Sequence, residues 1–142
     1  MVTRGNIVLD ASVVADGLIG TGEEGSRARE YLDHPSVYVP ELLFAEVGTV
    51  LKREERKTGV VADQKFQALL GYAWKSVPFE VFGSLSWRHR HHVSMYDACY
   101  LALSILLNAT LVTNDKRLAR AASRYCDVLI PGVEGEAGYQ PG

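Results

Sequence analysis

Four carboxylates in this sequence stand where globular proteins seldom place charge. Asp10 and Asp115 each follow a short apolar run, directly or almost directly, so both should project from the carboxyl ends of strands. Glu46 lies at helical spacing from apolar residues, which places it on or beside the buried stripe of a helix. Asp97 begins a helix that is apolar nearly all round, so the N-terminus of that helix should lie inside the fold.

If these four carboxylates meet, their repulsion raises their pKa values and destabilises the fold unless a divalent cation neutralises it. Oxygen ligands favour Mg²⁺ or Mn²⁺, and such an ion activates water and neutralises charge on a phosphodiester. Each residue also has an ordinary structural explanation. Asp10 and Asp115 are acceptable helix N-caps, Ser94-Met-Tyr-Asp97 resembles a capping box, and Glu46 at the edge of its stripe could reach solvent or an arginine.

Short apolar runs alternate with longer amphipathic segments, which is typical of an α/β domain with a central, mainly parallel sheet flanked by helices. Ligands bind beyond the carboxyl ends of the strands in such sheets. We expect one domain over residues 1–131 and a flexible tail over 132–142. Strands are expected at 7–9, 37–39, 78–82, 110–113 and 127–130, helices after residue 10 and at about 26–33, 40–58, 62–74, 94–107 and 115–123, a loop or frayed helix end at 17–25, and a short polar helix or turn at 84–92.

Composition narrows the class of protein. The 142 residues are 47% hydrophobic and 23% charged, which excludes a collagen, a coiled coil or a largely disordered chain. The formal charge of -2 provides no global positive field, so any basic surface must be local. Cys99 and Cys126 lack the spacing of a zinc site, and no apolar run has the length of a signal-peptide core or a membrane span. We therefore expect reduced thiols and a cytoplasmic protein.

Four sequence blocks together resemble the PIN domain, and more narrowly the VapC toxins of bacterial type II toxin–antitoxin systems. The resemblance extends from Ile7 to about Pro131, and the third and fourth blocks in combination are its most specific part. The blocks are Ile7-Val-Leu-Asp10-Ala-Ser12, Pro40-Glu-Leu-Leu-Phe-Ala-Glu46-Val, Ser94-Met-Tyr-Asp97-Ala-Cys-Tyr-Leu-Ala-Leu103 and Leu111-Val-Thr113-Asn-Asp115-Lys-Arg-Leu118. The resemblance implies a Mg²⁺- or Mn²⁺-dependent endoribonuclease that is inhibited by a cognate antitoxin and forms a homodimer.

The resemblance also implies roles for individual residues. Asp10, Glu46, Asp97 and Asp115 match the four acidic positions of the family in chain order. We expect Asp10 and Asp97 to hold the principal ion, with Asp115 and Glu46 binding it through water or holding a second ion, and Glu46 orienting the attacking water or accepting its proton. Ser12 and Thr113 match hydroxyl positions that would hydrogen-bond carboxylates or metal waters, although capping explains each equally well, and Asn114 could face the same site.

Basic residues near the acidic motifs are candidates for RNA contacts. Arg88 and Arg90 belong to the run Arg88-His-Arg-His-His92, which follows Trp87 directly. Lys116 and Arg117 begin the helix after Asp115, which also carries Arg120 and Arg124. A solvated surface is the ordinary explanation for both groups, and a His-x-His-His metal site without a remote ligand has weak support.

Two other functions fit parts of the pattern. A phosphatase with Asp10 as covalent nucleophile would usually carry a second aspartate where this chain has Ser12. The alternative of a different class is a non-catalytic metal-binding module that acts only as a partner in a regulatory complex. A groove for a partner helix or a second copy could include Leu42, Leu43, Phe66 and Leu70, although a place in the core explains these residues more simply.

Overall fold

A five-stranded sheet in which every pairing is parallel forms the centre of the protein, with the strand order β3-β2-β1-β4-β5. The computed structural model describes residues 4–133. The strands are β1 (Ile7–Leu9), β2 (Val37–Pro40), β3 (Lys75–Val77), β4 (Thr110–Val112) and β5 (Val128–Leu129), and the helices are α1 (Ala11–Ile19), α2 (Gly22–Leu32), α3 (Leu43–Thr58), α4 (Asp63–Gly71), α5 (Phe79–Arg88), α6 (Met95–Leu107) and α7 (Lys116–Ala122). The expected α/β class with a parallel sheet is confirmed.

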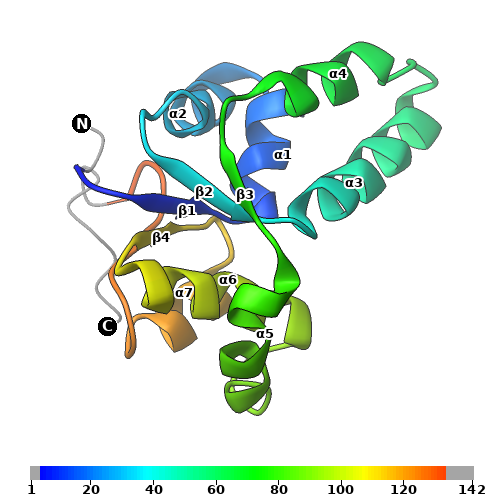
Figure 1. Ribbon diagram of the computed structural model, residues 1–142. Coiled ribbons are helices and arrows are strands. Elements are labelled where there is room, and N and C mark those ends of the chain that lie inside the picture. The colour runs from blue at the N-terminus through cyan, green and yellow to red at the C-terminus, as the bar shows by residue number, and fades with distance from the viewer. Residues whose placement is uncertain (1–3, 134–142) are drawn as a thin grey trace.

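Helices cover both faces of the sheet (Figure 1). Helices α1 to α4 lie on one side, with α1 packed against α2 and α3, whereas α5, α6 and α7 lie on the other. The short strands are fully or nearly fully buried in the centre of the sheet, which explains why they are continuous apolar runs rather than alternating ones. None of the helices among residues 4–133 has the length and hydrophobicity needed to cross a bilayer.

The strand order changes direction between β1 and β4. Chain connections run from β1 outward to β2 and β3 on one side, and from β4 to β5 on the other. Leu9 lies opposite Val112 in the register, and the backbone N–H of Asp10 continues the ladder by donating to the carbonyl of Val112 at 3.0 Å. The crevice beyond the carboxyl ends at such a reversal is where open parallel sheets bind ligands. Asp10 and Thr113 therefore leave their strands side by side at this crevice.

The expected strand at 78–82 is wrong. The strand in this region is β3, which ends at Val77, and Pro78 is the N-cap residue of α5. The aromatic and β-branched residues of the segment favour a strand by composition. Their burial instead follows a helical period, because Phe82 and Ser86 are both fully buried whereas Val81 is 57% exposed. The helix or turn expected at 84–92 is present, as the second half of α5 and the turn after it.

The glycine-rich segment 17–25, expected to be a loop or a frayed helix end, is largely helical, so of the two alternatives the loop is wrong. Helix α1 continues to Ile19, and α2 begins at Gly22. A Cβ atom on Gly17 would lie 2.6 Å from Cδ2 of Leu32 in α2. Glycine at this position therefore allows the two helices to pack closely rather than breaking the first of them.

Candidate active site

Asp10 is held at the crevice by two hydroxyl groups. It follows β1 directly, is 5% exposed, and accepts hydrogen bonds at Oδ2 from Ser12 Oγ (2.6 Å) and Thr113 Oγ1 (2.8 Å). Burial raises the pKa of Asp10, the hydroxyl contacts lower it, and the charge of Asp115 raises it further, with a net rise. The two hydroxyls fix the carboxylate where the ends of β1 and β4 meet.

Backbone groups in turn fix the direction of both hydroxyls. The N–H of Asn114 donates to Ser12 Oγ at 3.0 Å, and the N–H of Asp115 donates to Thr113 Oγ1 at 3.0 Å. Because a backbone N–H can only donate, each hydroxyl accepts there and gives its own proton to Asp10. Ser12 and Thr113 therefore both hydrogen-bond to Asp10, as predicted from the sequence.

The side chain of Asn114 contacts a fifth carboxylate, Asp16. Its Nδ2 donates to Oδ2 of Asp16 at 2.5 Å, and burial raises the pKa of Asp16. Asp16 was not predicted from the sequence, although a carboxylate within an apolar helix could have identified it. Asp16 lies within the apolar helix α1, as Glu46 lies beside the apolar stripe of α3.

Glu46 projects from α3 toward a buried tyrosine. Its Oε1 accepts a hydrogen bond of 2.6 Å from the hydroxyl of Tyr100 on α6, a side chain with no exposed surface. Burial raises the pKa of Glu46, the Tyr100 contact opposes that rise, and the charge of Asp10 adds to it. Burial and Glu46 raise the pKa of Tyr100, so the phenol remains protonated as a donor. Tyr100 was also missed, although a tyrosine inside an apolar helix requires a partner for its hydroxyl.

Asp97 interacts electrostatically with all three other carboxylates. Partial burial raises the pKa of Asp97 to about 6, and the charges of Asp10, Asp115 and Glu46 contribute to the rise. The side chain of Ser94 accepts a hydrogen bond of 3.1 Å from the backbone N–H of Asp97, as in a capping box. The structure therefore brings the four predicted carboxylates into one electrostatic cluster, and none of them forms an ion pair with a cationic side chain among residues 4–133.

Asp115 is both a member of this cluster and a helix cap. Its Oδ1 accepts hydrogen bonds from the backbone N–H groups of Arg117 (2.9 Å) and Leu118 (3.2 Å) at the start of α7. The capping explanation is therefore correct for this residue. Both contacts use the same oxygen, so the cap does not occupy Oδ2.

The donor chemistry of this cluster fits a hard divalent cation. It consists of carboxylate and hydroxyl oxygens with an excess of negative charge, which is the ligand type that Mg²⁺ and Mn²⁺ prefer. In the described part of the chain, no group of three or more histidine, cysteine, aspartate or glutamate side chains is arranged to hold a metal ion by itself. Mg²⁺ usually keeps several waters and binds only one or two carboxylates directly, so an open cluster of this kind suits it.

The four basic residues predicted to contact RNA lie in two separate places. Arg88 and Arg90 are exposed at the end of α5, where the guanidinium of Arg90 lies over the Trp87 ring at 4.4 Å and donates to the Trp87 carbonyl at 2.8 Å. Lys116 and Arg117 are exposed at the start of α7, directly after Asp115. The second pair directly follows a member of the acidic cluster.

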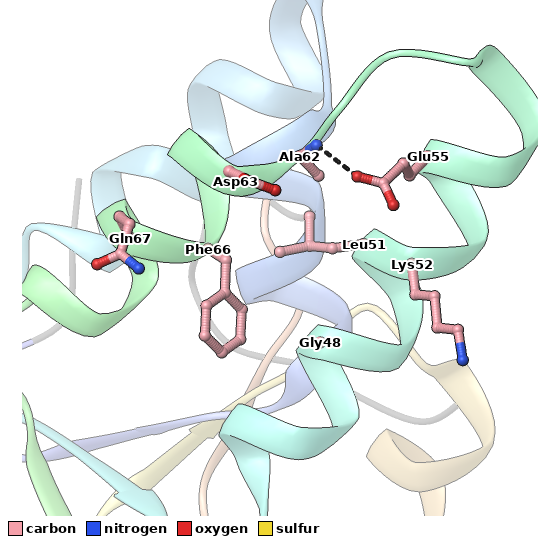
Figure 2. A pocket seen from close by; sticks show the side chains of 8 residues that line it. All are labelled: Gly48, Leu51, Lys52, Glu55, Ala62, Asp63, Phe66 and Gln67. Atoms are coloured by element: carbon pink, nitrogen blue, oxygen red, sulfur yellow. Dashed lines mark hydrogen bonds between the residues drawn. The ribbon is translucent and has the colours of Figure 1, made fainter.

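A hollow of about 340 Å³ lies between α3 and α4, and none of the four clustered carboxylates lines it (Figure 2). Phe66 and Leu51 give it an apolar wall, and Glu55 closes one end by accepting a 2.9 Å hydrogen bond from the backbone N–H of Ala62. Of the four apolar residues considered for a partner groove, Phe66 lines this hollow and Leu43 is buried in the core. Leu42 is half-buried, and Leu70 is exposed.

Comparison with known proteins agrees with this geometry. The sequence model of the PIN domain family matches residues 7–124. Ribonuclease VapC1 of Mycobacterium tuberculosis is 32% identical over 130 residues, covering 85% of this chain and 94% of the relative. Ribonuclease VapC9 of the same organism is 31% identical over 127 residues, covering 87% and 97%.

Solved structures show the same fold at low identity. PAE2754 from Pyrobaculum aerophilum has a TM-score of 0.61 at 19% identity, covering 82% of this chain and 78% of that one. FitAcB from Neisseria gonorrhoeae has a TM-score of 0.58 at 18% identity, covering 89% and 96%. The family match over most of the chain and the relatives above 30% identity decide the classification. The protein belongs to the PIN domain family and is of the VapC type.

Proposed function

We propose that this protein is a divalent-metal-dependent endoribonuclease and the toxin of a toxin–antitoxin pair. The observation that carries the proposal is the convergence of Asp10, Glu46, Asp97 and Asp115 at the sheet's switch point without a neutralising cation among residues 4–133. Relatives named as VapC ribonucleases support the reaction and the toxin role.

The residues divide into those that hold the ion and those that handle the proton. Asp10 and Asp97 would bind Mg²⁺ or Mn²⁺ directly, with Asp115 and Glu46 reaching it through water. When bound, the ion supplies an activated water and neutralises charge on the phosphodiester. Ser12 and Thr113 orient Asp10 through their hydrogen bonds to its Oδ2. No side chain then has to act as the nucleophile.

Glu46 would take a proton from the attacking water. Its pKa is raised by burial, which brings a carboxylate closer to the pH at which it works as a base. Tyr100 holds Oε1, so Oε2 is the atom that receives the proton. We assign Tyr100 the role of a positioning residue for this base.

The antitoxin and the homodimer remain part of the proposal. The VapC-type classification supports a cognate antitoxin that inhibits the enzyme. We expect the enzyme to be a homodimer, and analytical ultracentrifugation of the purified protein tests this directly.

The test of the proposed function is cleavage of a mixed pool of single-stranded and structured RNA by purified protein free of antitoxin. The reaction is run with Mg²⁺, with Mn²⁺ and with EDTA, for the wild type, Asp97→Asn and Asp33→Asn. Asp33 is an exposed aspartate at the end of α2, so its variant controls for the loss of one negative charge. We expect cleavage with either metal, none in EDTA, and none by Asp97→Asn.

Circular dichroism of the wild type and of each variant shows whether the protein is folded, so that a loss of cleavage is not mistaken for unfolding. A folded wild type that cleaves no RNA with any metal would refute the enzyme and favour the non-catalytic module. Cleavage that persists in EDTA would refute the metal dependence. Equal activity of folded Asp97→Asn and Asp33→Asn would refute the assigned site.

A further inference from the structure

A second pocket lies beside the acidic cluster and has the opposite charge. It is a hollow of about 290 Å³ lined by His92, Arg117, Arg120, Ala121, Arg124 and Tyr125, which we call the basic-aromatic pocket. The pocket begins two residues after Asp115, on the helix that Asp115 caps. Arg120 lies about 7.5 Å further along that helix from Asp115, at about 1.5 Å per residue.

Three arginines give this pocket its charge. Arg117, Arg120 and Arg124 are spaced three and four residues apart, so they share one face of α7 and the turn after it. None of the three forms an ion pair within residues 4–133, whereas Arg27 on α2 pairs with Glu23 at 3.3 Å. Guanidinium groups that lack an internal partner are suited to bind phosphate, because their planar donors match its oxygens.

An aromatic ring also lines the pocket and is held in place. Tyr125 is 41% exposed, stacks on His92 at 5.5 Å with an interplanar angle of 20°, and meets His89 edge-on at 4.6 Å. His89 and His92 approach each other at 3.1 Å between their Nδ1 atoms, so one ring donates and the other accepts. A ring fixed in this way has already lost the freedom that stacking on a nucleobase would cost.

We propose that the basic-aromatic pocket is a subsite for one unpaired nucleotide of the RNA next to the cleaved bond. The arginines bind the backbone phosphate of that nucleotide and Tyr125 stacks on its base. The inference rests on the proposed function, because it treats the acidic cluster as the place of cleavage. A base must be free of its partner to stack on a side chain, so this subsite makes the enzyme select single-stranded RNA.

The combination of charge and ring favours RNA over an acidic segment of a protein. Arginines alone would suit either partner, but an exposed ring beside them adds a surface on which any base stacks. The pocket and the acidic cluster are also joined by α7, because Asp115 caps this helix and Arg117, Arg120 and Ala121 on it line the pocket.

Measuring RNA binding in the absence of metal tests the subsite independently of cleavage. The probe is a fluorescein-labelled single-stranded RNA of about 12 nucleotides, titrated with the full chain in EDTA at several salt concentrations, with fluorescence anisotropy as the readout. A gel run after each titration verifies that the RNA is intact. Arg120→Ala/Arg124→Ala is compared with Arg53→Ala/Arg56→Ala, which removes two exposed arginines of α3 that lie outside the pocket.

The expected results are specific to each group. Removal of Arg120 and Arg124 weakens binding at least about tenfold at low salt, and the slope of log affinity against log salt falls by about 0.7 for each phosphate that is no longer neutralised. Tyr125→Leu weakens binding at least about fivefold, and Tyr125→Phe, which keeps the ring, restores it. The α3 control changes neither the affinity nor the slope, and a double-stranded RNA of the same sequence binds more weakly than the single strand.

Two results would overturn the subsite. One is equal affinity and salt dependence for the pocket and control double variants, and the other is a wild type that binds the duplex as tightly as the single strand. Because the measurement requires no cleavage, an inactive protein that still shows the pocket-dependent binding would refute the proposed function and support nucleotide binding at the pocket without a cleaved bond beside it. Normal metal-dependent cleavage, with RNA affinity unchanged in the pocket variants, would support the proposed function and refute the subsite.

Discussion

Replacing Asp97 with asparagine should stabilise the metal-free protein at neutral pH while it abolishes cleavage. The pKa of Asp97 rises from 3.8 to about 6 because of burial and three neighbouring carboxylates. At about 1.4 kcal/mol for each tenfold change in proton affinity, the rise corresponds to at most about 3 kcal/mol. Asp97 is partly exposed, so solvent screening reduces this value to about 1 kcal/mol. In a domain of this size that is an increase in Tm of about 4 °C.

The pH dependence has a definite sign. The folded protein holds the Asp97 proton more tightly than the unfolded chain, so the stability contributed by that proton is complete below pH 3.8 and lost as the pH rises through about 6. The wild type in EDTA should therefore lose stability over this window, and the asparagine variant should lose less. Thermal unfolding by circular dichroism from pH 4 to pH 8 measures both.

A matched control removes the effect of the helix terminus. Asp97 lies in the first turn of α6, where a negative charge contributes a few tenths of a kcal/mol through the helix dipole. Glu80 also lies in the first turn of its helix, α5, one position earlier than Asp97 does in α6, but it is exposed, so Glu80→Gln loses that contribution without relieving any repulsion. Addition of Mg²⁺ should raise the Tm of the wild type and not that of Asp97→Asn. Electrostatic repulsion at Asp97 is refuted if Asp97→Asn in EDTA at pH 8 is no more stable than the wild type, or if Glu80→Gln gains as much.

Three further substitutions test neighbouring contacts. Thr113→Val removes a buried donor to the site and should lower the free energy of unfolding by about 1–3 kcal/mol in urea titrations, together with kcat; unchanged values for both would contradict the hydroxyl's assigned role. Tyr100→Phe removes the contact that lowers the pKa of Glu46, so the acid limb of the pH–rate profile should move to higher pH; an unmoved limb would exclude Glu46 as the base. Gly17→Ala should cost about 1–3 kcal/mol because α1 and α2 pack closely there, whereas Gly71→Ala, which has open space, should be close to neutral; equal effects would refute the close-packing explanation.

Parts of the fold that depend on local pattern were correctly predicted from the sequence. Continuous apolar runs identified β1, β2 and β4, and the nearly all-apolar segment identified α6 with its Ser94 cap. The predictions failed where packing competes with composition. Phe79 and Phe82 favour a strand by residue type but belong to α5, and Gly17 serves a close helix contact rather than a break.

The sequence by itself determined which residue types stand at the ends of which elements, because turn chemistry and apolar periodicity are local properties of the chain. This was enough to single out the four carboxylates, whereas the hydroxyls of Ser12 and Thr113 were singled out by the resemblance to the PIN domain. Only the tertiary structure decided what each side chain meets. The contact from Tyr100 to Glu46 joins residues 54 positions apart, and the turn of Asn114 toward Asp16 joins residues 98 apart. Such pairs arise because the parallel sheet brings separate strand ends and helices to one edge, and no local pattern records that distance.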